Sequence, residues 1–224
     1  MYRLLQNYFE GTQPEVFAAD LQQKNWVILI EDDQGALKGF STLLLYETAF
    51  AGETITVVYS GDTIVDPSAW SSSVLPRAWI SAVRYLRQQY SHGRFYWLLI
   101  SSGFRTYRFL PTFWREFYPR YDAATPADLT ALTDFLCWNQ FQHHYDQDAG
   151  IVRLPQPQSL CEQLRQIPSE RLQDPHIAFF LQHNPGYGQG DELVCLTELT
   201  ETNLTAAGRR MWHSEFRLDL PALV

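Results

Sequence analysis

A glycine followed by an aspartate, Gly61-Asp62, interrupts a run of β-forming residues from Thr54 to Val65. A glycine inside such a strand marks a β-bulge or a close approach of another backbone, and a bulge releases a backbone N–H from the sheet. This N–H can polarise a ligand carbonyl, and the neighbouring Asp62 carboxylate can accept a proton from an amine. The pair therefore predicts a reactive centre, although a solvated aspartate on an irregular strand fits the same pattern.

Three serines, Ser71 to Ser73, stand where the next helix is expected to begin. Serine is a preferred helix N-cap, and the free N–H groups and dipole of a helix N-terminus favour an anion such as a pyrophosphate. A second strand, Phe95 to Ile100, follows the helix. A strand, a helix and a strand of these lengths form a parallel βαβ unit, whose crevice at the strand ends is the expected ligand site.

Two tyrosines, Tyr107 and Tyr118, lie in an aromatic and arginine-rich segment from Phe104 to Tyr121. A phenol placed near a thiolate can pass its proton to that thiolate, so either residue is a candidate general acid. The arginines of this segment, Arg105 and Arg108 among them, could hold an anion or a base. Core aromatics and solvated arginines explain the same composition.

The elements that would position these residues follow from periodicity and turn chemistry. A capping-box pattern at Thr12 to Glu15 starts a first helix, and Asp32 to Gly35 is the turn of a hairpin. Apolar residues at helical spacing, including Trp79, Val83 and Leu86, give the crossover helix one face for the sheet. We expect strands at 26–31, 37–48, 54–65, 94–101 and 192–197, and helices at 12–23, 74–90, 126–142 and 202–212, with a short helix around Phe113, Trp114 and Phe117 between Pro111 and Pro119. The predicted class is α+β with a mixed sheet.

This order of a helix, an antiparallel meander, a bulged central strand, a crossover helix and a parallel strand resembles the GNAT superfamily of acyl-CoA-dependent N-acyltransferases. The resemblance covers roughly residues 10 to 120. It implies an antiparallel meander joined to a parallel βαβ unit, with helices on both faces of the sheet. The family's glycine-rich pyrophosphate loop is absent, and the chain has Asp66-Pro67-Ser68-Ala69-Trp70 followed by the three serines in its place.

The resemblance also implies roles for individual residues. Acyl-CoA or acetyl-CoA would lie between the two parallel strands as co-substrate, with Gly61 at the thioester carbonyl and Ser71, Ser72 and Ser73 at the pyrophosphate. Ser102 and Tyr107 stand nearest to the positions where the family often has an asparagine and a general-acid tyrosine. Residues 1–121 would form the GNAT-like core, and residues 122–224 a helical and irregular extension packed on it or a continuation of the same domain.

Composition excludes several other classes. A formal net charge of -8 argues against nucleic acid as a partner, because phosphate binding needs a concentrated basic surface. The three cysteines are far apart, so we expect reduced thiols, a cytoplasmic location and no zinc site, and we find no apolar run that suggests a membrane partner. His143 and Asp148 have a spacing seen in glycerolipid acyltransferases, and with their polar neighbours they could bind a metal, but an exposed loop accounts for them and we expect no metal.

Two functions remain after these exclusions. The first is an acyltransferase that moves an acyl group from acyl-CoA or a carrier thioester to an amine of a small molecule or peptide. The second is a GNAT-fold protein that has lost cofactor binding and only binds a ligand or another protein. The loop from residue 66 to residue 73 distinguishes them, because its amides either converge on an open crevice or are blocked by Trp70.

Overall fold

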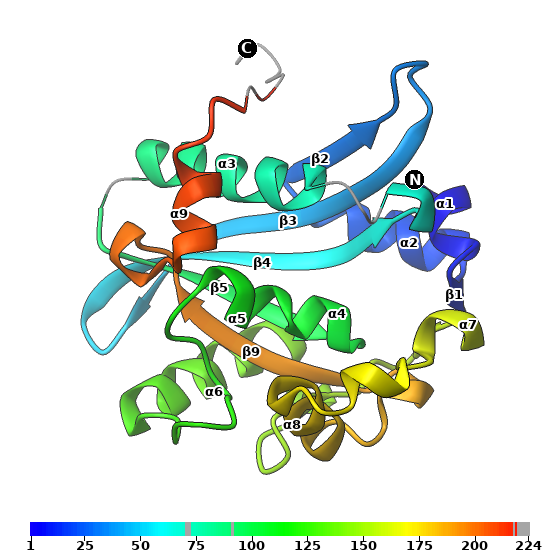
Figure 1. The fold of residues 1–224 in the computed structure, drawn as a ribbon. Helices are drawn as coiled ribbons and strands as arrows, with labels where there is room; N and C mark the ends of the chain where they lie inside the picture. The colour runs from blue at the N-terminus through cyan, green and yellow to red at the C-terminus, as the bar shows by residue number, and fades with distance from the viewer. Residues whose placement is uncertain (70–72, 91, 217, 219–224) are drawn as a thin grey trace.

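The computed structural model describes residues 1–69, 73–90, 92–216 and 218. Its centre is a mixed seven-stranded sheet in the order β2-β3-β4-β5-β9-β7-β6, with helices on both faces (Figure 1). The predicted α+β class with a mixed sheet is confirmed. The strands are β2 (Trp26–Glu31), β3 (Leu37–Phe50), β4 (Glu53–Val65), β5 (Arg94–Ser101), β9 (Glu192–Glu198), β7 (Ile151–Val152) and β6 (Tyr145–Asp146), and a separate pair is formed by β1 (Phe9–Glu10) and β8 (Ser159–Leu160).

Strands β2, β3 and β4 form the predicted antiparallel meander. The turn between β3 and β4 places Ala51 and Gly52 at positive φ, a conformation that a tight hairpin turn requires. Ser41 pairs with Thr63 and Leu43 pairs with Ser60, so Thr42 alone faces two residues of β4, Gly61 and Asp62. Two residues opposite one define a β-bulge, and the predicted bulge at Gly61 is confirmed.

The crossover helix α3 (Val74–Gln89) joins β4 to a parallel β5, as predicted. It packs on the sheet through Trp79, Val83 and Leu86, each at most 3% exposed. The parallel pairing ends where Ser60 faces Leu99. Beyond this point β4 continues to Val65 with β3 alone, so β4 and β5 separate next to the bulge.

Each face of the sheet has its own core. On the α3 face lie α4 (Phe104–Tyr107), α5 (Phe109–Phe113), α8 (Pro175–His183) and α9 (Ala206–Trp212), and Figure 1 shows α9 beside α3. The other face is covered by α6 (Ala127–Phe141), close to its predicted bounds. Because side chains alternate along a strand, Phe40 lies on the α6 face, and α1 (Tyr2–Gln6) and α2 (Pro14–Gln22) pack against it there.

The C-terminal half of the chain completes the same sheet. Strand β9 pairs antiparallel with β5 from Tyr96–Glu198 to Ser101–Leu193. Strands β7 and β6 then extend the sheet beyond β9. Strands from both sides of the expected boundary at residue 121 therefore share one sheet. In the described part of the chain, no helix combines the length and the apolar character that crossing a membrane requires.

The segment after β5 differs from the prediction. The two short helices α4 and α5 end at Phe113, whereas Trp114 is extended and bridges to Leu204. Pro111 does not bound the helix but lies in the first turn of α5, where a missing N–H leaves no bond unmade. The predicted helix through Trp114 and Phe117 is therefore wrong.

Candidate functional site

A large cavity of about 750 Å³ opens where β4 separates from β5. Ser60 and Thr63 of β4, Leu99 of β5 and the first turn of α3 at Leu75 line it. Its size suits a cofactor-sized ligand. In an open sheet, ligands bind outside the carboxyl ends of parallel strands, so the cavity has the position that the βαβ unit predicts.

One wall of the cavity is aromatic and rigid. The rings of Trp79 and Trp97 lie 4.2 Å apart between centroids, and Phe109 packs 5.9 Å from both. The Trp97 indole N–H donates a buried hydrogen bond of 2.8 Å to the Ser60 hydroxyl, which fixes the ring against β4. An apolar wall held in this way can accommodate an extended hydrocarbon chain.

The opposite wall carries arginines. Arg105, Arg108 and Arg171 line the cavity, with Glu170 beside them. Arg105 donates to the Leu164 carbonyl at 2.8 Å, and burial together with the charge of Arg171 lowers its pKa. Arg108 forms an ion pair with Asp174. The wall suits an anion; the sequence indicated Arg105 and Arg108, but no pattern pointed to Arg171.

The loop before α3 forms the cavity edge, where Tyr8 and Ala69 lie. Asp66 accepts hydrogen bonds from the Ser68 hydroxyl and N–H and from the Tyr8 hydroxyl, and these bonds lower its pKa. Asp66 therefore stays ionised and closes the turn. Ser73 is the N-cap residue of α3, although its side chain makes no capping bond. Ser71, Ser72 and Trp70 lie outside the described residues.

A second group of polar side chains lies on the α6 face of the sheet, at the bulge. We call Asp20, Asp62 and Glu192 the acidic cluster. Lys24 Nζ lies 2.5 Å from the Asp20 carboxylate and 5.3 Å from the ring centroid of Tyr59, and its side chain is only 1% exposed. A Cβ at Gly61 would lie 2.7 Å from Lys24 Cε and 2.8 Å from Thr42 Oγ1, so any other residue would displace the lysine or the threonine side chain. Gly61 therefore makes room for the lysine.

The acidic cluster holds carboxyl groups of unequal acidity. Burial, and then the charge of Asp20, raise the pKa of Asp62 to about 6, while Lys24 opposes the rise. Burial, and then the charges of Asp62 and Asp20, raise the pKa of Glu192 to about 8. Near neutral pH Asp62 is ionised and Glu192 is protonated. Two carboxyls whose surroundings separate their pKa values in this way are typical of acid–base sites.

The structure does not bring the two candidate tyrosines to the large cavity. Tyr107 is fully buried, burial raises its pKa, and its hydroxyl donates to the Pro119 carbonyl at 3.0 Å. Tyr118 exchanges backbone hydrogen bonds with Leu196 and lines a different cavity. Ser102 follows the last residue of β5 and precedes Gly103, which lies in the wall of the large cavity. The residues that sequence reasoning missed near Asp62 are Asp20, Lys24 and Glu192.

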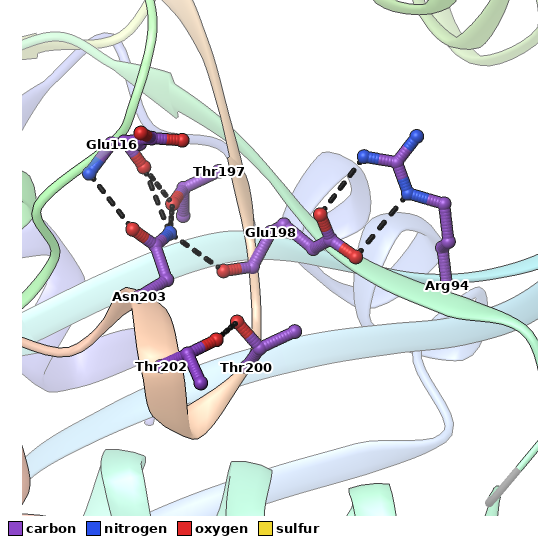
Figure 2. A network of polar contacts seen from close by, with 7 residues as sticks. All are labelled: Arg94, Glu116, Thr197, Glu198, Thr200, Thr202 and Asn203. Atoms are coloured by element: carbon purple, nitrogen blue, oxygen red, sulfur yellow. Dashed lines mark hydrogen bonds and ion pairs between the residues drawn. The ribbon is translucent and has the colours of Figure 1, made fainter.

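The second cavity, of about 330 Å³, lies at the other end of β5, and Figure 2 shows its polar network. The Asn203 side chain accepts from the Glu116 N–H and donates to the Glu116 carbonyl, the Thr197 hydroxyl and the Glu198 carbonyl. Arg94 pairs with the Glu198 carboxylate at 2.9 Å. These hydrogen bonds join the segment after α5 to β9, so the network stabilises the fold.

His143 and Asp148 are both exposed, and the imidazole rings of His143 and His144 lie 4.0 Å apart. Within the described ranges, no group of three or more histidine, cysteine, aspartate and glutamate side chains is arranged to hold a metal ion.

Searches against models of known protein families and against curated proteins found no match for this chain. The geometry of the site therefore carries the functional argument.

Proposed function

We propose that this protein is a GNAT-like acyltransferase that moves an acyl group from acyl-CoA, or a carrier thioester, to an amine of a small molecule or peptide. The observation that carries the proposal is the cavity at the point where β4 leaves β5, which is lined by Ser60 and Thr63 on either side of the bulge and by the first turn of α3. The family resemblance assigns donor binding to these two features, the bulge in β4 and the start of α3.

Different parts of the acyl donor would contact different walls of the cavity. The acyl chain and the thioester arm would lie against Trp79 and Trp97, because an apolar wall stabilises hydrocarbon groups. The phosphates would lie toward Arg105 and Arg171 and the N-terminus of α3, because guanidinium groups and helix N-termini both favour phosphate. These arginines supply the charge complementarity that a glycine-rich loop does not provide in this chain.

The acidic cluster would act on the acceptor amine, by taking up the proton that the amine loses. The amine nitrogen attacks the thioester carbonyl carbon, the C–N bond forms, and the C–S bond breaks with release of the thiolate. Asp62 does not line the donor cavity, but its neighbours Ser60 and Thr63 do, and its own side chain lies on the α6 face. The amine would therefore reach the thioester from the α6 side, where β4 and β5 separate, and its proton would pass to the Asp62 carboxylate, which is ionised near pH 7 because its pKa is about 6. The thiolate takes up a proton from solvent, since neither Tyr107 nor Tyr118 lies at the cavity.

The alternative function is ligand binding without catalysis, and the missing glycine-rich loop favours it. A thermal-shift series with acetyl-CoA, octanoyl-CoA and free CoA tests donor binding first. A ligand at one hundred times its dissociation constant stabilises the fold by about 2.7 kcal/mol. Stabilisation by acyl-CoA together with acyl transfer to an amine supports the enzyme, and stabilisation without transfer to any amine supports the binding protein.

Two arginine variants make the test specific. Arg171→Gln removes a positive charge from the cavity wall and should weaken acyl-CoA binding by about tenfold, or 1.4 kcal/mol. Arg210→Gln removes an exposed charge on α9 and should leave acyl-CoA binding unchanged. Equal stabilisation of the wild type and both variants would place the anion elsewhere, and no stabilisation by any acyl-CoA would refute donor binding in this cavity.

A further inference from the structure

The large cavity extends inward from the strand ends, between β5 and α3. On β5 it is lined by Leu99 and Trp97, and two residues of a strand span about 6–7 Å. On α3 it is lined by Leu75 and Trp79, and four residues of a helix span about 6 Å. The rings of Trp79 and Trp97 lie 4.2 Å apart between centroids, so both walls end at the same pair of rings. The cavity therefore extends at least about 6 Å along both walls.

The outer end of the cavity is charged and the inner end is aromatic. Arg105, Glu170 and Arg171 line the cavity and are exposed. Four residues after Arg105, the half-buried Phe109 lines the cavity and packs 5.9 Å from each of the two tryptophan rings. A charged rim in front of an apolar interior suits a ligand with an anionic part and a hydrocarbon part.

The rings at the inner end hold one another in place. Trp114 is 2% exposed and packs 5.1 Å from Trp97 and 5.7 Å from Trp79 between centroids. The Trp97 indole N–H already donates to the Ser60 hydroxyl, so this ring offers a ligand its apolar surface. Each methylene group that leaves water for such a surface strengthens binding by roughly fourfold. The inner end therefore favours a hydrocarbon chain over a single methyl group.

We propose that the acyl group of the donor is an unbranched chain of about six carbons or more, with its end at Trp79 and Trp97. This inference rests on the proposed acyltransferase function and names the class of its donor. An acetyl group extends only one carbon–carbon bond, about 1.5 Å, beyond the thioester carbonyl, whereas an extended hexanoyl chain spans about 6 Å. With the thioester at the strand end, only the longer chain reaches the two rings.

Calorimetry of acyl-CoA binding without an amine tests the chain independently of acyl transfer. The probes are acetyl-CoA, butanoyl-CoA, hexanoyl-CoA and octanoyl-CoA, which differ only in their number of methylene groups. We expect the dissociation constant to fall roughly tenfold with each added pair of methylene groups up to hexanoyl-CoA. Octanoyl-CoA should bind at least as tightly as hexanoyl-CoA.

Matched variants locate the chain. Phe109→Ala removes a ring from the inner end and should reduce the preference for octanoyl-CoA over acetyl-CoA by about tenfold. Phe135→Ala is the control, because it deletes another half-buried phenylalanine, on α6 at the opposite face of the sheet, and it should retain the preference. An unchanged preference in Phe109→Ala would contradict this placement of the chain.

The wild-type series decides the proposal even if a variant fails to fold. Equal affinity for acetyl-CoA and octanoyl-CoA, or no binding of any acyl-CoA, would overturn the long acyl chain. Equal affinity together with acyl transfer would leave the acyltransferase standing. Affinity that rises with chain length without transfer to any amine would support the chain and refute the acyltransferase alone, so the two failures are distinguishable.

Discussion

The replacement of Glu192 by glutamine should make the protein more stable in alkaline solution. The folded state raises the Glu192 pKa from an ordinary value of 4.5 to about 8, so ionisation of this carboxyl opposes folding. Its contribution to stability is fully present below about pH 4.5 and is lost as pH rises through about 8. Glutamine stays neutral, so the Glu192→Gln variant does not suffer this loss.

The magnitude follows from the two pKa values. Each pKa unit corresponds to about 1.36 kcal/mol, which sets an upper limit of ~5 kcal/mol on the whole effect. Between pH 5.5 and pH 9, ionisation of Glu192 would lower the free energy of unfolding by at most ~3.4 kcal/mol, because the loss continues only up to the pKa of about 8. The side chain is partly accessible to solvent, which reduces this loss to about 2 kcal/mol. We therefore expect the difference in the free energy of unfolding between Glu192→Gln and the wild type to increase by about 2 kcal/mol, in favour of the variant, from pH 5.5 to pH 9.

Urea unfolding at pH 5.5 and pH 9 measures this difference directly. Glu47→Gln is the control, because it makes the same chemical change at an exposed position of the same sheet. The control should follow the wild type at both pH values. If Glu192→Gln and the wild type lost stability in parallel between pH 5.5 and pH 9, the raised pKa of Glu192 and the argument built on it would be refuted.

Three further variants test the fold and the mechanism. Trp79→Ala should lower the free energy of unfolding by about 3–5 kcal/mol, because the ring is 3% exposed and packs on Trp97, and an unchanged denaturant midpoint would contradict this packing. Asn203→Ala removes the partner of the Glu116 N–H and one donor each from the Glu116 and Glu198 carbonyls, and should cost about 2–3 kcal/mol, whereas an unchanged denaturant midpoint would contradict this role. Asp62→Asn should lower acyl-transfer turnover while acyl-CoA affinity stays nearly unchanged, and a fully active variant would remove Asp62 from the mechanism.

The features that could be predicted from the sequence are those that local chemistry determines. The hairpin turns, the periodicity of α3 and the bulge at Gly61 each depend on residues close together in the chain. The parallel order of β4 and β5 follows from them, because a helix between two strands makes a right-handed crossover. The helix after β5 was misplaced because Pro111 can either end a helix or begin one, and local sequence does not distinguish these roles.

The candidate site shows the same division between local and tertiary information. The sequence alone determined that Gly61 and Asp62 form an irregular point in a central strand, beside the start of a helix. Only the tertiary structure decided that Lys24, Tyr59 and Glu192 surround Asp62, because β9 inserts next to β5 and brings Glu192 from a distant part of the chain. Burial and mutual charge then separate the acidities of the carboxyls, and both are properties of the folded environment that no local pattern encodes.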